Sequence, residues 1–459
     1  IAFAGLDEDD EYDMLAVYQW DGPDKGLYVT EDKALERLIR EYDFEIKSSG
    51  IREVLDVLKA YAPRRACCSD PDLIAVNNGI FNYKTKMLQS FSPDLVFTSK
   101  ARVNYNLLAQ NVIIHNDDDG TDWDVDSWID EVANHDPELV QLLWELIGAS
   151  IRPNVPWNKS AWLLSEAGNN GKGSLCSLMR NTLGKGSHTS IPLVAFSKDF
   201  MLEPLIKVNA VITDENPVGI YLDDAANLKA VITGDTVLVN RKYKTPVAIR
   251  FHGLIVQCVN EMPRVRDRSE SFLRRLLPIP FMQCFTGRER KYIKEDYLKR
   301  PEVLEYVLCK VLNMDYYELS EPAVCKQALA EFRIGNDPVA QFIEEMLPQC
   351  KWDFIPFSFL YDLYSEWLKK NCPSSLSYKL NTRPFYREIR RILANSSEWH
   401  ALGTDETRQV GARMNAAEPL IQQYGLTNWF NPTYIGNDPE KLCHPAIPQG
   451  GVRGIERRR

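Results

Sequence analysis

The sequence lacks the features typical of membrane proteins, of proteins from oxidising compartments and of highly basic proteins that bind nucleic acid over their whole surface. No apolar run approaches the ~20 residues that a membrane-spanning helix needs, and no secretory signal is visible. The ten cysteines form no C-x-x-C pair and the six histidines are scattered, which predicts reduced thiols and no zinc site. The formal net charge is −10, so any contact with DNA must come from local basic clusters. We therefore expect a cytosolic protein with no membrane contact.

The composition is that of an ordinary globular protein with several domains. At 459 residues, of which 44% are hydrophobic and 26% charged, the chain is long enough for two to four domains. It begins at Ile1 instead of Met, and we expect a fragment or a processed chain that lacks an upstream domain. The pattern predicts a helix over Trp128–Ile151, and strands alternating with helices from Trp162 to Phe281. Such alternation is typical of an α/β domain with a largely parallel sheet.

The most informative segment is Ala161–Ser174, with the sequence AWLLSEAGNNGKGS. Its small residues let backbone N–H groups approach an anion, and the helix predicted over Leu175–Leu183 favours negative charge at its start. We expect Lys172 to neutralise the β- and γ-phosphates of ATP and Ser174 to bind Mg²⁺. The residues expected around the phosphates are Gly168, Asn169, Asn170, Gly171, Lys172, Gly173 and Ser174.

This loop departs from the usual phosphate-binding pattern at two positions. Glu166 stands where a glycine is usual, and Gly173 separates Lys172 from the hydroxyl residue. A second GKGS, over Gly184–Ser187, follows a helix-like segment instead of a strand. There we predict an exposed helix stop with glycine at the C-cap.

Polar side chains follow the next two apolar strands. In AVITDENP, we predict that Asp214 holds Mg²⁺ through a bound water and that Glu215 orients or deprotonates the attacking water, because ligands gather at the carboxyl ends of parallel strands. A strand that ends in an acidic turn is the alternative. In GLIVQCVNEMP, Asn260 is predicted to reach between the γ-phosphate and that water, and a turn asparagine before Pro263 is the alternative.

Two arginines precede the last apolar strand of this region, in SFLRRLLPIPF. Arg274 or Arg275 is a candidate arginine finger, which would stabilise transition-state charge on the nucleotide of a neighbouring subunit. The alternative is a surface pair that makes weak salt bridges. Taken in order, the loop, the double acid, the asparagine and the arginine favour an ATPase.

Between the acids and the asparagine lies a segment of a different kind, TGDTVLVNRKYKTPVAIRFHG. Its alternation predicts two antiparallel strands whose turn presents Arg241, Lys242, Tyr243 and Lys244. Cations around an aromatic ring suit single-stranded nucleic acid, because the charges pair with phosphates and the ring stacks on bases. The alternative is a solvated basic hairpin tip.

On these segments the sequence strongly resembles superfamily 3 helicases, specifically the primase–helicases of satellite phages, prophages, mobile islands and poxviruses. The matching segments are GNNGKGS, AVITDENP, KAVITGDTVLVNRKYKTP, VQCVNEMP and FLRRLLPIPF, with LIAVNNGIFNYKT and LLWELIGASI upstream. The resemblance implies an AAA+-like P-loop ATPase that works as a ring, usually a hexamer, with ATP between subunits and the hairpins in a central channel. By motif position, Lys242 and Lys244 match the family's DNA-contacting residues, and Arg275 matches its trans-acting arginine better than Arg274 does.

The resemblance also suggests domains, cofactors and partners. We expect an α+β domain over residues 1–150, the ATPase domain over 151–310, a helical, winged-helix-like domain over 320–400 and a partly flexible extension over 401–459. ATP and Mg²⁺ are the expected cofactors, single-stranded or forked DNA is the expected substrate, and a primase or polymerase domain or protein is the expected partner. The implied setting is replication of a phage or mobile element in the cytoplasm of a bacterial host.

The last third of the chain leaves other functions open. DPVAQFIEEML, FSFLYDLYSEWLKK and RPFYREIRRIL predict three helices, the third with an apolar face opposite a basic one. The basic face fits a recognition helix on duplex DNA, and a solvated surface equally well. Its basic residues are Arg383, Arg387, Arg390 and Arg391. An origin-binding scaffold whose ATP site controls assembly is therefore an alternative to a helicase. A viral packaging motor is another, although it gives no account of VNRKYKTP.

Overall fold

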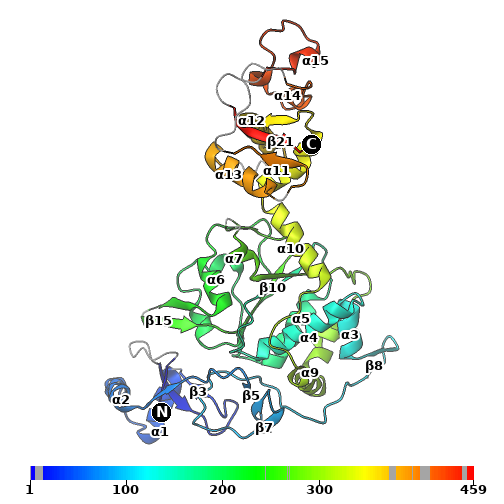
Figure 1. Ribbon diagram of the computed structural model, residues 1–459. Helices are drawn as coiled ribbons and strands as arrows, with labels where there is room; N and C mark the ends of the chain where they lie inside the picture. Colours follow the sequence, from blue (N-terminus) through cyan, green and yellow to red (C-terminus); the bar gives the residue numbers. More distant parts are fainter. Residues whose placement is uncertain are drawn as a thin grey trace. The chain divides into compact units, whose positions relative to one another are not determined.

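The structure is a computed structural model that describes residues 2–5, 14–30, 32–242, 244–265, 267, 269–371, 379–394, 396–403, 414–446 and 452–458. The chain folds into two compact units, residues 1–330 and 331–459 (Figure 1). The boundary between them lies within α10 (Ala323–Gly335). The finer division into four domains stays a prediction. Among the described residues, no helix has both the length and the apolar character needed to cross a membrane.

The first part of unit one consists of small sheets and short helices. One sheet has the order β3-β2-β1-β4, made of β1 (Ala2–Gly5), β2 (Met14–Tyr18), β3 (Tyr28–Val29) and β4 (Arg64–Ala66). The helices α1 (Asp32–Tyr42) and α2 (Ser48–Tyr61) follow β3. An antiparallel meander comes next, made of β5 (Leu73–Val76), β6 (Gly79–Asn82) and β7 (Met87–Gln89). The strands β8 (Ile114–Asn116) and β9 (Thr121–Trp123) form a hairpin.

The helix expected over Trp128–Ile151 is two helices instead, α3 (Val125–Val132) and α4 (Pro137–Ile151). Asn134 and His135 between them have positive φ angles of 56° and 59°, which an α-helix does not allow. Pro137 is the first residue of the second helix, a position that suits proline because the N–H it lacks would have no partner within the helix. The apolar periodicity continues across this break, which is why the pattern alone predicts a single helix.

The centre of unit one is a five-stranded parallel sheet in the order β11-β12-β16-β10-β18. The strands are β10 (Ser160–Leu164), β11 (His188–Thr189), β12 (Ala210–Thr213), β16 (Leu254–Val259) and β18 (Leu276–Pro280). This confirms the mixed α/β fold with a parallel sheet. After β10 the chain forms β11, β12 and β16 on one side of it and then crosses to form β18 on the other side. Such a switch point is where open α/β sheets bind ligands, at the carboxyl ends of the strands.

Helices and the sheet enclose one main core in unit one. The helices α4, α5 (Lys172–Leu183) and α9 (Pro301–Asn313) contact one another and contribute buried apolar residues to it (Figure 1). Leu146 and Ile147 of α4 are fully buried in the same cluster as Ala161 and Leu163 of β10. The core therefore extends across residue 150.

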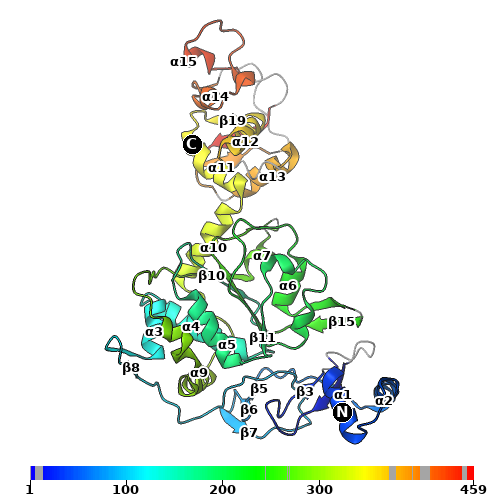
Figure 2. The same ribbon diagram turned by 180° about the vertical axis from the view of Figure 1, so that it is seen from behind.

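A hairpin and several short elements complete unit one. The strands β14 (Thr236–Arg241) and β15 (Lys244–Arg250) pair antiparallel, as the alternation predicts, with an irregular register between Val239 and Arg241. β14 contacts α6 (Ala226–Thr233), and both views place the hairpin at the edge of this unit (Figures 1 and 2). The short elements are β13 (Tyr221–Leu222), β17 (Arg264–Val265), α7 (Glu270–Leu273) and α8 (Lys291–Glu295), with 3-10 turns at 193–195, 203–206 and 297–299.

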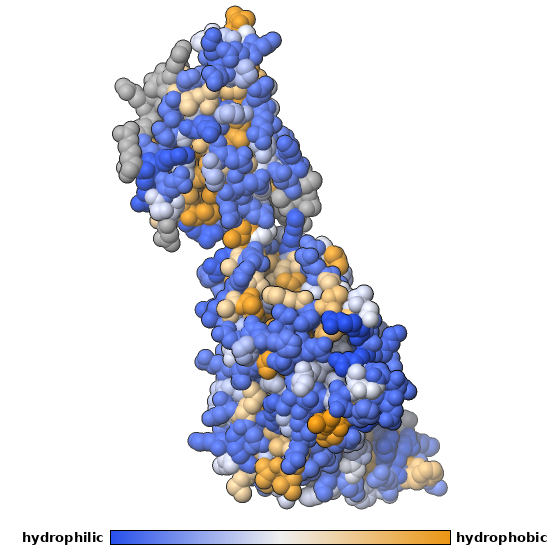
Figure 3. Space-filling model, turned by 90° about the vertical axis from the view of Figure 1, so that its right-hand side faces the viewer, coloured by the Kyte–Doolittle hydropathy of each residue, from blue (hydrophilic) through white to orange (hydrophobic). Residues whose placement is uncertain are grey.

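Unit two combines helices with a small antiparallel sheet around its own core. Along the chain it has α11 (Pro338–Met346), β19 (Phe354–Pro356), α12 (Phe357–Asn371), α13 (Thr382–Leu393), β20 (Trp399–Ala401), α14 (Leu420–Gln423), α15 (Pro439–Leu442) and β21 (Gly454–Arg457). The sheet order is β19-β21-β20. All three predicted helices are present and bury Phe342, Leu363 and Phe385 in one cluster. The face of the molecule in Figure 3 is mainly hydrophilic, with hydrophobic residues in small groups.

Candidate nucleotide-binding site

The loop between β10 and α5 has the backbone form of an anion cradle. Gly171 caps the amino end of α5 with a φ of 90°, and a Cβ there would lie 3.0 Å from the side chain of Val132. Glycine is thus required at this position for both conformation and space. The side chain of Asn170 donates to the carbonyl of Ala167 and accepts from the backbone N–H of Lys172. These bonds hold the loop in shape at the start of the helix.

Lys172 joins the carboxyl ends of two neighbouring strands. Its Nζ donates hydrogen bonds of 3.1 Å each to the carbonyl of Ser165, the carbonyl of Val259 and Oδ1 of Asn260. The residue is 7% exposed, and burial lowers the pKa of its ammonium group. All three acceptors are neutral oxygens, so among the described residues these bonds bring no carboxylate to neutralise the cation. The structure therefore brings together Lys172 and Asn260, which the sequence placed in one site.

The two carboxylates lie where predicted, immediately after β12, and both are exposed. Arg180, on α5, donates from Nη2 to Oδ2 of Asp214 at 2.6 Å. The buried side chain of Asn216 donates to Oε1 of Gln257 and to the carbonyl of Cys258, at 3.0 Å each. This anchor of the acidic turn to β16 was not expected from the sequence, although a polar residue between two acids and a proline was a visible signal.

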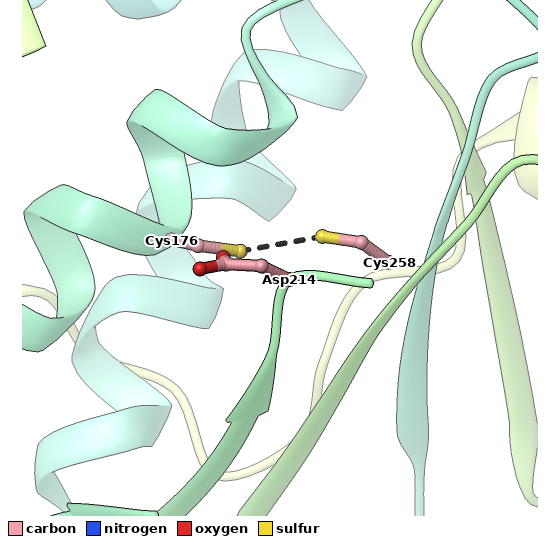
Figure 4. A group of neighbouring side chains, drawn as sticks. All are labelled: Cys176, Asp214 and Cys258. Carbon is pink, nitrogen blue, oxygen red and sulfur yellow. Dashed lines mark hydrogen bonds between the residues drawn. The ribbon is translucent and has the colours of Figure 1, made fainter. Parts of the chain in front are cut away.

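Two cysteines lie beside Asp214 (Figure 4). The Sγ atoms of Cys176, on α5, and Cys258, on β16, are 3.5 Å apart. Both residues are buried. The hydrogen bond to Cys258, burial and the charge of Asp214 raise the pKa of the Cys176 thiol well above its ordinary value, so this thiol is protonated at neutral pH.

A cavity of about 370 Å³ opens against the phosphate loop. One wall is the loop itself, and the others come from α3 and from the segment after β18. The residues from these other walls are Trp128, Glu131, Phe285, Arg288, Glu289, Arg290, Lys291, Ile293 and Lys294. They combine apolar side chains, which suit a flat base, with four cations, which suit phosphates, and two carboxylates, of which Glu131 pairs with Arg290 at 3.0 Å. The basic run GRERKYIK after the last strand was the signal for this wall, and it was not among the segments expected at the site.

The remaining loop residues also lie at this site. Ser174 is partly buried in the first turn of α5 and lines the cavity with Asn169, Asn170 and Gly173. A Cβ at Gly173 would lie 3.3 Å from Nζ of Lys294, so the extra glycine leaves room for a second cation beside the loop. No atom approaches within 4 Å of a Cβ built at Gly168.

The two arginines lie at the amino ends of the strands, opposite the carboxyl ends where Lys172 and Asn260 meet. The backbone carbonyl of Arg275 accepts from the N–H of Ser160, the first residue of β10, at 2.8 Å, whereas the phosphate loop follows the last residue of that strand. Four residue steps of a strand span roughly 13 Å. The Arg275 side chain donates to the carbonyl and hydroxyl oxygens of Ser271, and Arg274 is exposed at the end of α7. Within this chain, both arginines are therefore separated from the site of Lys172 by the length of β10.

The basic residues of the hairpin differ in their surroundings. Arg241 ends β14, and its Nε lies 3.6 Å from Oε1 of Glu203, so this cation is paired with a carboxylate of the same chain. Lys242 is exposed in the turn. Tyr243 and the side chain of Lys244 lie outside the described residues.

The four arginines predicted to form the basic face of α13 differ in their exposure and their partners. Arg383 and Arg387 are exposed there. Arg391, in contrast, pairs with Glu388 and Asp337 within unit two. The guanidinium of Arg390 lies 5.1 Å from the ring centre of Phe357.

Three family models match separate parts of the chain. Residues 11–134 match the model described as "D5 N terminal like", residues 163–275 match a "Family of unknown function (DUF5906)", and residues 334–416 match "Poxvirus D5 protein-like". The middle match contains the phosphate loop, both carboxylates, the hairpin, Asn260 and the arginine pair.

Longer matches are found to one curated viral protein and to solved structures. The protein named "Putative helicase L207/L206", from Acanthamoeba polyphaga mimivirus, is 23% identical over 394 residues, which is 76% of this chain and 39% of the viral protein. The chain thus spans well under half the length of that relative. Two apo structures of the NrS-1 C-terminal region are 15% and 14% identical, with TM-scores of 0.43 and 0.42, and each match covers 94% of this chain and 91% of the other.

Proposed function

Because the chain belongs to the D5-like primase–helicase family, we propose that unit one is an AAA+-like ATPase that drives a DNA helicase in the replication of a phage or mobile genetic element. The observation that carries this proposal is the set of bonds from Lys172 to Ser165, Val259 and Asn260. They put the phosphate-binding cation and the polar residue after β16 in contact at the ligand-binding edge of the sheet.

The residues present fit ATP and Mg²⁺. The glycine-capped helix start offers backbone N–H groups to phosphates, and Ser174 and Asp214 offer the oxygen ligands that Mg²⁺ prefers. When bound, Mg²⁺ neutralises charge on the phosphates. Lys172 binds the β- and γ-phosphates, and Glu215, exposed on the same edge, orients or deprotonates the attacking water.

The contact between Lys172 and Asn260 also suggests how the site senses its nucleotide. All three donors of the ammonium group have acceptors in the structure, so a phosphate that binds Lys172 replaces at least one of them. Two of these acceptors are backbone carbonyls fixed in or beside the sheet. Asn260 is the one acceptor of the three that belongs to a side chain and can therefore rotate. When the γ-phosphate binds Lys172, Asn260 is released and turns toward the attacking water.

The place of Arg275 supports assembly into a ring, which we take to be hexameric. At the amino edge of the sheet this arginine is too far from its own phosphate loop to act there. It has the position of a residue that completes the site of a neighbouring subunit. The β14–β15 hairpin, with Lys242 exposed in its turn, is then the element that contacts single-stranded DNA.

Hydrolysis and unwinding by purified protein test this function directly. Wild type should release phosphate from ATP in the presence of Mg²⁺, faster with single-stranded DNA, and should unwind a forked duplex. Glu215→Gln should bind ATP but hydrolyse it roughly 10²–10⁴-fold more slowly, as expected when a general base is lost. Glu318→Gln, an exposed residue outside the site, is the matched control. Equal hydrolysis by wild type and Glu215→Gln, or no phosphate release by wild type with DNA, contradicts the proposal.

One observation favours a second DNA contact in unit two. The order α11, β19, α12, α13, β20 and β21, with the sheet β19-β21-β20, is similar to that of a winged-helix module with α14 and α15 inserted between its last two strands. Its third helix, α13, exposes Arg383 and Arg387. We propose that this helix binds duplex DNA through these two residues. If the protein binds a duplex but never unwinds a fork, the scaffold function replaces the helicase.

A further inference from the structure

Three potential metal ligands converge behind the phosphate loop from three different elements (Figure 4). Cys176 comes from α5, Cys258 from β16 and Asp214 from the end of β12. The two Sγ atoms are 3.5 Å apart, and these sulfurs and a carboxylate oxygen all lie within 4.8 Å of one another. We propose that this cluster binds a thiophilic divalent cation, Zn²⁺ in the cell, which competes with Mg²⁺ for Asp214.

The spacing of the ligand atoms suits a tetrahedral ion. Bonds of about 2.3 Å to sulfur and about 2.0–2.2 Å to carboxylate oxygen place the ligands of zinc roughly 3.5–3.8 Å apart. Two sulfurs need about 3.8 Å, and the Sγ atoms are 3.5 Å apart, within a few tenths of an ångström of that separation. A carboxylate oxygen of Asp214, whose side chain is 45% exposed, already lies within 4.8 Å of both sulfurs, so small side-chain adjustments complete the geometry. The site thus needs no movement of the backbone.

The donor set selects against the ion that the ATPase uses. Thiolate is a soft ligand that favours Zn²⁺, whereas Mg²⁺ demands oxygen ligands in octahedral geometry. Each thiol releases its proton to solvent as its sulfur–metal bond forms, and no oxidation is involved. Three protein ligands leave a fourth tetrahedral position for water, and the exposed side chain of Asp214 offers a path for entry.

Arg180 does not close the site. Its Nη2 bonds Oδ2 of Asp214 at 2.6 Å, and a carboxylate has a second oxygen with which to bind a metal. An arginine in this place orients the ligand from outside the coordination sphere, as partners of metal-bound carboxylates do. Among the described residues, this is the one set of three such groups whose ligand atoms come close enough to share an ion.

The consequence for the motor follows from the positions of the two cysteines. Cys176 stands two residues after Ser174, and Cys258 two residues before Asn260. An ion on both sulfurs draws Asp214 away from Mg²⁺ and ties α5 to β16, so that ATP hydrolysis stops. This inhibition rests on the proposed function, whereas binding of the metal does not.

Cobalt spectroscopy without nucleotide tests the site itself. Thiolate bound to Co²⁺ gives an intense ligand-to-metal charge-transfer band, and we expect one equivalent of Co²⁺ to produce it and Zn²⁺ to abolish it. All variants carry Cys284→Ser, which removes the one thiol that is exposed among the cysteines the structure describes. Cys258→Ala should lower Co²⁺ affinity at least tenfold, while Cys309→Ala, another buried cysteine of unit one, should leave it unchanged. Absence of the band, or an equal band in Cys258→Ala, overturns the proposal. Asp214→Asn keeps both thiols and should also bind Co²⁺ at least tenfold more weakly, so it decides the matter if Cys258→Ala does not fold.

Zinc titration of the ATPase at a fixed excess of Mg²⁺ tests the regulatory part. The concentration for half-inhibition should be at least tenfold higher in Cys258→Ala than in Cys309→Ala, and equal values overturn the inhibitory role. If no variant hydrolyses ATP, the proposed function fails, but the cobalt experiment still decides whether the metal binds.

Discussion

Lys172 and Asn260, 88 residues apart in the chain, are hydrogen-bonded through Nζ and Oδ1 at 3.1 Å. The bond exists because β10 and β16 are parallel neighbours, so that the residues after their last positions meet at one edge. In the proposed function this bond links Lys172, which binds the phosphates, to Asn260, which responds to the presence of the γ-phosphate. Variants of Lys172 test the phosphate-binding role. Variants of Arg275, at the amino ends of the strands, test the contact with a neighbouring subunit in the proposed ring.

Lys172→Ala should abolish ATP hydrolysis while the protein stays folded. The variant loses the cation that offsets phosphate charge, and we expect kcat to fall by about 10³-fold, the order seen when transition-state charge loses a fixed partner. Lys185→Ala is the matched control, because it changes the lysine of the second GKGS, which ends α5 at the C-cap glycine Gly184. Steady-state phosphate release and thermal unfolding measure the two effects. Equal loss in both variants would contradict the assignment of the loop.

Arg275→Ala should be inactive alone but active when mixed with Lys172→Ala. Each variant keeps the half of the shared site that the other lacks, so mixed rings contain some intact sites. Phosphate release measured against the mixing ratio should rise above that of either pure variant. Arg274→Ala should keep most of the wild-type activity. A mixture no more active than its parts shows that Arg275 does not act between subunits.

Lys244→Ala should weaken the binding of single-stranded DNA and uncouple hydrolysis from unwinding. Each lost phosphate contact lowers the slope of log affinity against log salt by about 0.7 for a single strand. Lys242→Ala should behave in the same way, since Lys242 is exposed in the turn. Lys326→Ala, on the exposed side of α10, is the control. Fluorescence anisotropy over a range of salt concentrations measures the slope, and an unchanged slope in Lys244→Ala excludes a phosphate contact.

Lys100 should make the stability of unit one depend on pH. It is 1% exposed, and its Nζ donates to the carbonyl of Lys25 at 2.9 Å. Burial, aided by the charge of Arg102, lowers its pKa from 10.5 to about 8. Between these values the unfolded chain binds more protons than the folded one, so the free energy of unfolding rises with pH.

The Lys100→Met variant isolates this effect. Below about pH 8 the wild type carries the full cost of a buried charge, and the cost fades toward pH 10.5. The advantage of Lys100→Met in unfolding free energy should therefore be largest at neutral pH and shrink as pH rises. Urea denaturation at several pH values measures it. A difference that stays constant over this range contradicts the shift.

Local patterns predicted the elements that have a local cause. The alternation around VNRKYKTP gave the hairpin β14–β15, and the Asn-Asn-Gly turn gave β5 and β6. A single helix over Trp128–Ile151 was wrong because positive φ angles at Asn134 and His135 leave no trace in apolar spacing. The cavity wall over residues 285–294 was missed because its basic run has no motif.

The sequence by itself determined that a phosphate loop, a double acid, an asparagine and an arginine follow one another at the ends of apolar strands, since these features depend on residue type and spacing. Only the tertiary structure decided which of them meet. The order of the strands brought Asn260 into hydrogen-bond contact with Lys172 and put Arg275 at the amino ends of the strands, away from both. It also brought together Cys176 and Cys258, 82 residues apart, a pair that no C-x-x-C spacing indicates. Contacts between distant residues follow from how strands pair and helices pack, and no short stretch of sequence records that choice.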